Sequence, residues 1–273
     1  MQNQGADAGR ALAHKYNILI TMKQEATLEH KHDSEKHADH TENLVNVDEN
    51  LAHKVHGKES RESKESKADK KPFKVLAVSD THGDMKKIRE LADVASKEKV
   101  DLVVLAGDWS NNDEIPPYLI SPFLKEGRRV VFVPGNHESM STTYFLSDLY
   151  KIKHLHGKAT IYGDIGFFGA GGANMGPHPM NDDEIFYQLK KSFQEIKDAK
   201  TKVMVTHAHP SGTKMEKFTQ IFPGSDAVRR AIDEFKPDIV LCGHVHEAEG
   251  IEEMIGKTKV INVAKSGKIL EFN

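Results

Sequence analysis

The sequence predicts an α/β domain in which two packed, mixed β-sheets are flanked by helices and preceded by a disordered tail. Three observations lead to this prediction: short apolar runs rich in β-branched residues, amphipathic patterns between several of these runs, and a charged N-terminal stretch without such runs. Strand runs that alternate with helical patterns are typical of parallel βαβ units. The 273 residues fit one large domain plus a tail as well as two domains, and the composition favours the tail.

The predicted tail covers residues 1–72. Lys, Glu, Asp, Ser and His crowd this stretch, and aromatic residues are nearly absent from it. Such a segment buries too little apolar surface to offset the entropy lost on ordering, so we expect it to be disordered. The histidines between residues 30 and 40 lack a fixed geometry for metal binding, and we interpret them as part of a solvated tail. The folded domain is expected to span residues 73–273.

Five apolar runs are expected to form buried strands, because each run is short, continuous and rich in Val, Ile or Leu. These runs are Lys74–Val78, Val100–Ala106, Arg129–Val133, Lys202–Val205 and Asp238–Leu241. The sections Thr160–Gly172 and Lys259–Phe272 are predicted to add further strands, some of them antiparallel. Together the strands are expected to make the two sheets.

Helices are predicted where apolar residues recur on one face at helical spacing. The first is Met85–Lys97, with Ile88, Leu91, Ala92 and Ala95 on its apolar face. The second is Asp183–Lys197, with Ile185, Leu189, Phe193 and Ile196 on its apolar face. Both helices lie between predicted strands, as expected for helices that cover a sheet.

Charge and cysteine content limit the partners that we expect. The formal net charge of -3 is spread over mixed signs, which does not favour a nucleic-acid partner. The single cysteine, Cys242, excludes an intramolecular disulfide and agrees with a reducing compartment. The run Tyr16–Met22 is too short to span a bilayer, and the first residues lack a signal-peptide pattern. We therefore expect a cytoplasmic protein without a membrane partner.

Seven side chains that can bind metal follow the ends of the five predicted strands. They are Asp80, His82, Asp108, Asn136, His207, His244 and His246. In sheets of this kind, ligands bind beyond the carboxyl ends of the strands, where successive loops converge. Imidazole and carboxylate groups suit first-row divalent ions. Each short motif alone is a common loop pattern, but all of them in this order predict a metal-dependent hydrolytic site.

Asp108 is the expected bridging ligand, because one carboxylate can hold two ions together. The pairs Asp80-X-His82 and His244-X-His246 place two side chains so close along a loop that both can reach one ion or serve two. Manganese is the ion that we expect, although iron, zinc, nickel and cobalt also accept these ligands.

The motifs resemble those of the calcineurin-like metallophosphoesterase superfamily, and the resemblance covers residues 73–273. The matching motifs are Asp80-X-His82, Gly107-Asp108, Gly135-Asn136-His137-Glu138, His207 and Gly243-His244-X-His246. This resemblance implies a four-layer αββα sandwich and hydrolysis of a phosphoester substrate. It also implies two metal sites that share Asp108.

The resemblance assigns each ligand to one of the two ions. One ion would be held by Asp80, His82, Asp108 and His246. The other would be held by Asp108, Asn136, His207 and His244. His137 would face the phosphate as the catalytic histidine.

The charges of this set predict its chemistry. Two divalent ions with two carboxylates and neutral imidazoles leave a charge of about +2, in which a bridging water is expected to ionise near neutral pH. The hydroxide would attack phosphorus in line, while His137 stabilises charge or protonates the leaving oxygen.

The substrate class is less defined by the motifs. The phosphate-binding arginines of protein serine/threonine phosphatases are missing, since Trp109–Asn112 and Pro134 occupy the places where they are expected. We therefore expect a phosphodiesterase or phosphatase for a small or nucleotide-like substrate, similar to small prokaryotic and especially archaeal phosphoesterases. A DNA or RNA nuclease of the same superfamily and a catalytically silent interaction scaffold are the alternatives. The motifs carry no information on the oligomeric state.

Several neighbours of the motifs have alternative interpretations. Trp109 either packs or stacks on a substrate, and neither role is favoured. We interpret His209 as a surface loop histidine rather than a substrate contact. His154, His156 and His178 are interpreted as ordinary loop residues, and Cys242 is expected in the core.

Overall fold

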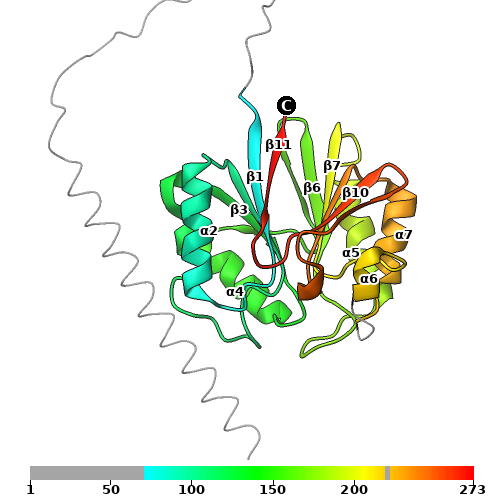
Figure 1. Ribbon diagram of the computed structural model, residues 1–273, viewed down its shortest axis with the longest axis horizontal. Coiled ribbons are helices and arrows are strands. Elements are labelled where there is room, and N and C mark those ends of the chain that lie inside the picture. The colour runs from blue at the N-terminus through cyan, green and yellow to red at the C-terminus, as the bar shows by residue number, and fades with distance from the viewer. Residues whose placement is uncertain (1–70, 219–221) are drawn as a thin grey trace, which may run out of the picture. The chain divides into compact units, whose positions relative to one another are not determined.

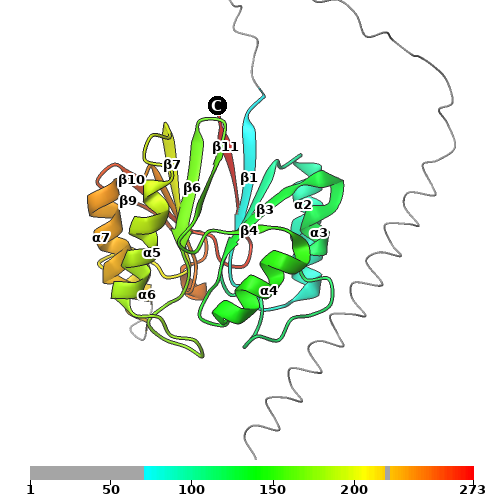
Figure 2. The ribbon, with the colours of Figure 1, turned by 180° about the vertical axis from the view of Figure 1, so that it is seen from behind.

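The computed structural model describes residues 71–218 and 222–273, and the predictions for residues 1–70 lie outside this part of the chain. Two β-sheets lie face to face, and helices cover the outer face of each sheet (Figure 1). Figure 2 shows the same four layers from behind, with α2, α3 and α4 on one side and α5, α6 and α7 on the other. The predicted αββα fold is therefore confirmed.

The first sheet has five strands in the order β11-β1-β2-β3-β4. Its strands are β1 (Phe73–Val78), β2 (Leu102–Ala106), β3 (Arg129–Val133), β4 (Lys153–His154) and β11 (Lys268–Phe272). β11 runs antiparallel to β1, and the other neighbours pair in parallel. β2 begins later than the predicted Val100, because the Val100 N–H instead bonds to Ala95 O at the end of the preceding helix.

The second sheet has six strands in the order β5-β6-β7-β8-β10-β9. Its strands are β5 (Ala159–Tyr162), β6 (Ile165–Ala170), β7 (Thr201–Thr206), β8 (Ile239–Cys242), β9 (Glu252–Ile255) and β10 (Thr258–Asn262). The two outer pairs, β5 with β6 and β9 with β10, are antiparallel, and the inner pairs are parallel. Both sheets are thus mixed, as predicted.

Side-chain caps begin the four longest helices of the described residues. The helices are α2 (Met85–Lys97), α3 (Ser121–Leu124), α4 (Met140–Tyr150), α5 (Asp182–Gln194), α6 (Lys214–Phe218) and α7 (Asp226–Phe235), with 3-10 turns η1 (Lys125–Gly127) and η2 (His246–Ala248). The caps of α2, α4, α5 and α7 are Asp84, Ser139, Asn181 and Ser225. Each cap accepts a hydrogen bond from a backbone N–H that the first turn leaves free.

No helix of the described residues is long and apolar enough to cross a membrane.

Three apolar clusters fill the three interfaces between the four layers. Leu76 of β1 packs with Ile88 of α2 on the outer face of the first sheet. Val75, the preceding residue, faces the opposite way and packs with Val203 of β7 between the sheets. Leu189 of α5 belongs to the third cluster, outside the second sheet. This alternation explains why the strands are apolar on both faces and why their runs are continuous in the sequence.

Candidate metal centre

The loops after β1, β2, β3, β7 and β8 gather at one end of the sandwich, below the strands in the view of Figure 1. Backbone hydrogen bonds join these loops: Asp80 N donates to Gly107 O at 3.0 Å, and His82 N donates to Asp108 O at 2.9 Å. The backbone hydrogen bonding between β1 and β2 therefore continues into the loops that carry the predicted ligands. This pairing determines how far apart the predicted ligands of the two loops lie.

Four of the seven predicted ligands have a left-handed backbone. Their φ angles are 58° for Asp80, 44° for His82, 50° for Asp108 and 70° for His244. A residue with a Cβ atom in this conformation costs about 1–2 kcal/mol, and such strain persists where the surrounding structure imposes it. Strained residues of this kind gather at functional sites.

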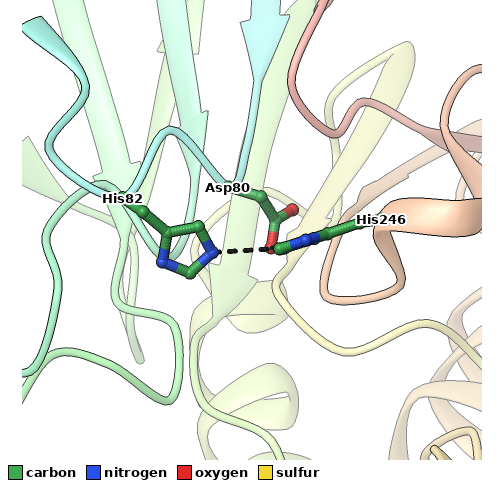
Figure 3. Close-up of side chains that lie close together, drawn as sticks. All are labelled: Asp80, His82 and His246. Atoms are coloured by element: carbon green, nitrogen blue, oxygen red, sulfur yellow. Dashed lines mark hydrogen bonds and ion pairs between the residues drawn. The ribbon is translucent and has the colours of Figure 1, made fainter.

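Asp80, His82 and His246 form the first cluster, in which one ligand atom from each lies within 4.8 Å of the others. Figure 3 shows the three side chains converging from the loop after β1 and from η2. The Nε2 atoms of His82 and His246 are 3.1 Å apart, and His246 Nε2 is 3.2 Å from Asp80 Oδ1. Ser79 Oγ and His244 N donate to the other oxygen of Asp80, at 2.5 Å and 3.1 Å, and hold the carboxylate in place.

Asp108, His207 and His244 form the second cluster, again with ligand atoms within 4.8 Å of one another. His207 Nε2 lies 3.2 Å from Asp108 Oδ2 and 3.0 Å from Asn136 Oδ1. The opposite nitrogen, Nδ1, donates to Ala106 O at 3.0 Å. Metal-binding histidines commonly donate their second N–H to a carbonyl in this way, because the bond orients the ring.

Asp108 lies between the two clusters. Its Oδ2 atom is 3.9 Å from His82 Nε2 in the first cluster and 3.2 Å from His207 Nε2 in the second. His137 Nε2 is also 3.9 Å from this oxygen, and His137 N donates to Asp108 Oδ1 at 3.0 Å. One carboxylate therefore connects both clusters with the predicted catalytic histidine.

The pKa values of two buried histidines diverge within the second cluster. Burial disfavours the His207 cation, but the charge of Asp108 and its hydrogen bond outweigh burial and raise the pKa of His207 to about 10. Burial and the charge of His207 lower the pKa of His244 to about 3. A positive charge is thus favoured at His207 Nε2, whereas His244 keeps a neutral ring.

The donor set fits divalent metal ions. His244 Nε2 is buried and has no hydrogen-bond partner among the described residues, so it is available as a neutral nitrogen ligand. His207 Nε2 lies close to two oxygen atoms, Asp108 Oδ2 and Asn136 Oδ1. Without a metal ion, a proton on His207 Nε2 is the only donor for both oxygens among these three atoms. A cation at this place would replace the proton that Asp108 favours on His207.

Two glycines allow the loops to approach the ligands closely. A Cβ atom on Gly135 would lie 1.9 Å from Asp108 Oδ1, and one on Gly107 would lie 2.4 Å from His207 Nδ1. Gly107 also has a φ of +91°. A side chain at Gly135 would displace Asp108, and one at Gly107 would displace His207.

Glu138 connects the loops after β2 and β3 by hydrogen bonds. Its carboxylate accepts hydrogen bonds from Asp108 N at 3.0 Å, Ser110 N at 2.9 Å, Ser110 Oγ at 2.8 Å and Gly135 N at 2.7 Å. Burial and repulsion by Asp108 raise the pKa of Glu138 to about 8, while the donors from Gly135 and Ser110 favour the anion. The role of this residue is structural support of the ligand loops.

Replacing Glu138 by Ala is expected to lower the free energy of unfolding by about 3 kcal/mol. Each buried donor left without an acceptor costs about 1–3 kcal/mol, and the total is smaller than the sum because water can replace the carboxylate for some of the donors. Glu138→Gln keeps one acceptor oxygen and should lose less. Urea unfolding of both variants measures the difference. An unchanged midpoint in the Ala variant would show that the four hydrogen bonds contribute nothing to the fold.

The neighbouring residues differ from some predictions. Trp109 is buried and donates from Nε1 to Val133 O at 3.0 Å, so it packs against the core. His209 is 0% exposed, and its interpretation as a surface histidine is wrong. Ser225 N donates to His209 O at 2.8 Å and holds the loop against the domain. Cys242 is buried, as predicted.

The interpretation of His154 and His156 as ordinary loop residues also needs correction, whereas His178 lies in a loop, as predicted. His154 is buried in β4, and the His156 ring accepts a hydrogen bond from Gly171 N at 3.1 Å. His178 Nε2 lies 3.1 Å from Asp113 Oδ2, and its backbone N–H donates to Asn136 O at 3.0 Å. His178 therefore supports the loop that carries a predicted ligand.

The fold and this arrangement of aspartates and histidines define the class of αββα proteins with side chains suited to bind divalent metal ions. The model of the calcineurin-like phosphoesterase family matches residues 73–248, and the chain belongs to this family. Membership indicates a hydrolase that acts on phosphoester bonds with divalent metal ions, and the described residues include groups of Asp and His side chains suited to hold such ions.

Solved structures show the same fold. The protein TT1561 of Thermus thermophilus is similar with a TM-score of 0.58 and 20% identity, covering 71% of this chain and 90% of that chain. Phosphopantetheinyl hydrolase from Mycobacterium tuberculosis is similar with a TM-score of 0.51 and 12% identity, covering 71% of this chain and 89% of that chain. The comparison with curated proteins found no match.

Proposed function

We propose that the protein is a binuclear metallophosphoesterase that hydrolyses a small or nucleotide-like phosphoester. Asp80, His82, Asp108 and His246 would hold one ion. Asp108, Asn136, His207 and His244 would hold the other. The position of Asp108 between the two clusters is the observation that supports two ions rather than one. Manganese stays the expected ion, although iron, zinc, nickel and cobalt also accept this set of nitrogen and oxygen donors.

The bound ions would supply positive charge for the phosphate and would favour ionisation of a water molecule near neutral pH. The residues of the chain determine where the substrate approaches. The side chains of His82, His137 and His246 are 26%, 23% and 34% exposed, whereas those of Asp108 and His207 are almost fully buried. The partial exposure of the three rings supports substrate entry from their side, where His137 would contact the phosphate.

The exposed side of the site also supports a small substrate. A cavity of about 570 Å³ opens beside Asp80 and His82, and this volume suits a small molecule. The missing arginines of the protein phosphatases agree with this substrate class. The cytoplasmic location stays a prediction.

A panel of substrates tests the proposed function. Purified protein loaded in turn with Mn, Fe, Zn, Ni or Co would be assayed with a bis-aryl phosphodiester, an aryl phosphomonoester, cyclic nucleotides and single-stranded DNA. We expect hydrolysis of at least one small ester, fastest with Mn, and loss of activity on chelation. Hydrolysis of DNA alone would favour the nuclease alternative, and no hydrolysis with any metal would favour a silent scaffold.

A further inference from the structure

The cavity beside the first cluster contains two lysines that the proposed chemistry does not use. Asp80 and His82 of the first cluster line it, and so do Lys87 and Lys265. A molecule that filled the cavity would therefore contact residues of the first cluster and both lysines. The lysines come from distant parts of the sequence, the first turn of α2 and the loop between β10 and β11.

Each lysine occupies an unfavourable position: Lys87 for its charge, and Lys265 for its backbone conformation. Lys87 is in the first turn of α2, which contains no acidic residue, and a positive charge is unfavourable at the positive end of a helix. Lys265 has a φ of 53°, a conformation that costs a residue with a Cβ atom about 1–2 kcal/mol. The neighbouring structure imposes this conformation, because Lys265 N donates to Ser79 O at 2.8 Å, directly before the ligand Asp80.

Both lysines also lack a partner for their charge. Within residues 71–218 and 222–273, neither Nζ atom makes a hydrogen bond or an ion pair. The two acidic side chains of the cavity outside the metal cluster are already bound to backbone amides. Asp84 accepts from Lys86 N and Lys87 N, and Glu249 accepts from Ser266 N at 3.1 Å. Each of these carboxylates therefore has a backbone amide as its partner and is not bonded to a lysine ammonium group.

We propose that Lys87 and Lys265 form an anion subsite that binds a second phosphate or carboxylate group of the substrate. This inference rests on the proposed function, because the reacting phosphoester would lie at the metal ligands while the second anion occupies the cavity. Two ammonium groups bind an anionic oxygen more strongly than a neutral group, since hydrogen bonds between ions are the stronger kind. The substrate class is thus a phosphoester with an additional negative group on the same molecule.

Paired substrates test the subsite. The diester pair is the dinucleotide ApA with and without a 5′-phosphate, and the monoester pair is 3′-AMP and adenosine 3′,5′-bisphosphate. The pair is chosen according to the ester class that the wild-type protein hydrolyses. We expect wild-type protein to prefer the member with the extra phosphate, and the double variant Lys87→Met/Lys265→Met to lower this ratio of kcat/KM by roughly 10-fold, mainly through KM.

The double variant Lys86→Met/Lys257→Met is the matched control, because both of these lysines are exposed and do not line the cavity. It should keep the wild-type ratio, and Lys87→Arg/Lys265→Arg should keep most of it. Metal content and Tm are measured for all variants. If the Lys87→Met/Lys265→Met variant kept the wild-type ratio, with or without an equal slowing of both substrates, the subsite would be refuted. If the wild-type protein hydrolysed neither the diester pair nor the monoester pair, the proposed function would fail first, and the two failures are distinguishable.

Discussion

Replacing Asp108 by Ala is expected to lower the bound metal below two ions per chain and to reduce hydrolysis by roughly 10³-fold, since metal ions supply several kcal/mol of transition-state stabilisation. The physical reason is the position of the carboxylate between the two clusters. Its Oδ2 atom faces His207 at 3.2 Å and His82 at 3.9 Å, so its loss removes a ligand from both proposed ions. Metal analysis by mass spectrometry and steady-state kinetics with the best substrate measure the two effects.

Asp148→Ala is the matched control for this variant, because Asp148 is an exposed aspartate of α4 outside the site. Its metal content and rate should equal those of the wild-type protein. The Asp108 variant also loses the acceptor of the His137 N–H, so its unfolding midpoint is measured beside its metal content. A folded Asp108→Ala protein that still bound two ions at wild-type affinity would contradict the bridging assignment.

The strands could be predicted because they are buried on both faces and therefore appear as continuous apolar runs. α2 could be predicted as well, since Ile88, Leu91, Ala92 and Ala95 are its buried residues and lie on one stripe. Other elements give weaker signals. The edge strand β9 contains two glutamates and no buried residue, so it has no apolar run that a sequence pattern could reveal.

Four of the described helices, α3, α4, α6 and α7, were not predicted, and the two longest of these, α4 and α7, were missed for different reasons. α4 buries Thr142, Thr143 and Leu146, and threonines on a buried face hide the apolar stripe. α7 buries Ala227, Val228, Ala231 and Ile232 after the cap Ser225. This spacing is that of an amphipathic helix and could have been found in the sequence. Alanines make up half of the buried stripe, however, and their small side chains give a weak apolar signal.

The positions of the predicted ligands could be inferred because each follows a strand end, and parallel strands bring such ends together. Contacts between loops could not be inferred in this way. Lys265 bonds to Ser79, and His178 pairs with Asp113, only after the two sheets pack. The hydrogen bond from Ser225 N to His209 O likewise joins two segments that are separate in the sequence. Such pairings leave no periodic pattern, so the sequence alone does not reveal them. The roles of the ligands stay predictions.

Replacing His137 by Ala is expected to lower kcat by roughly 10²- to 10⁴-fold while both metal ions stay bound, as for loss of a general acid or a charge-stabilising contact. The His137 ring packs edge-on against His82, with centroids 4.8 Å apart, and its side chain is 23% exposed. We therefore expect the ring to contact the phosphate rather than to complete the buried ligand set.

The rival role for His137 is that of a metal ligand, since His82, Asp108 and His137 also offer three ligand atoms within 4.8 Å of one another. His246→Ala, which removes a proposed ligand, provides the comparison. If His137 is catalytic, its variant keeps wild-type metal content and loses kcat, whereas the His246 variant loses metal. Equal metal loss in both variants would make His137 a ligand. An unchanged kcat would remove it from the mechanism, because a ring that contacts the reacting phosphate must affect the chemical step.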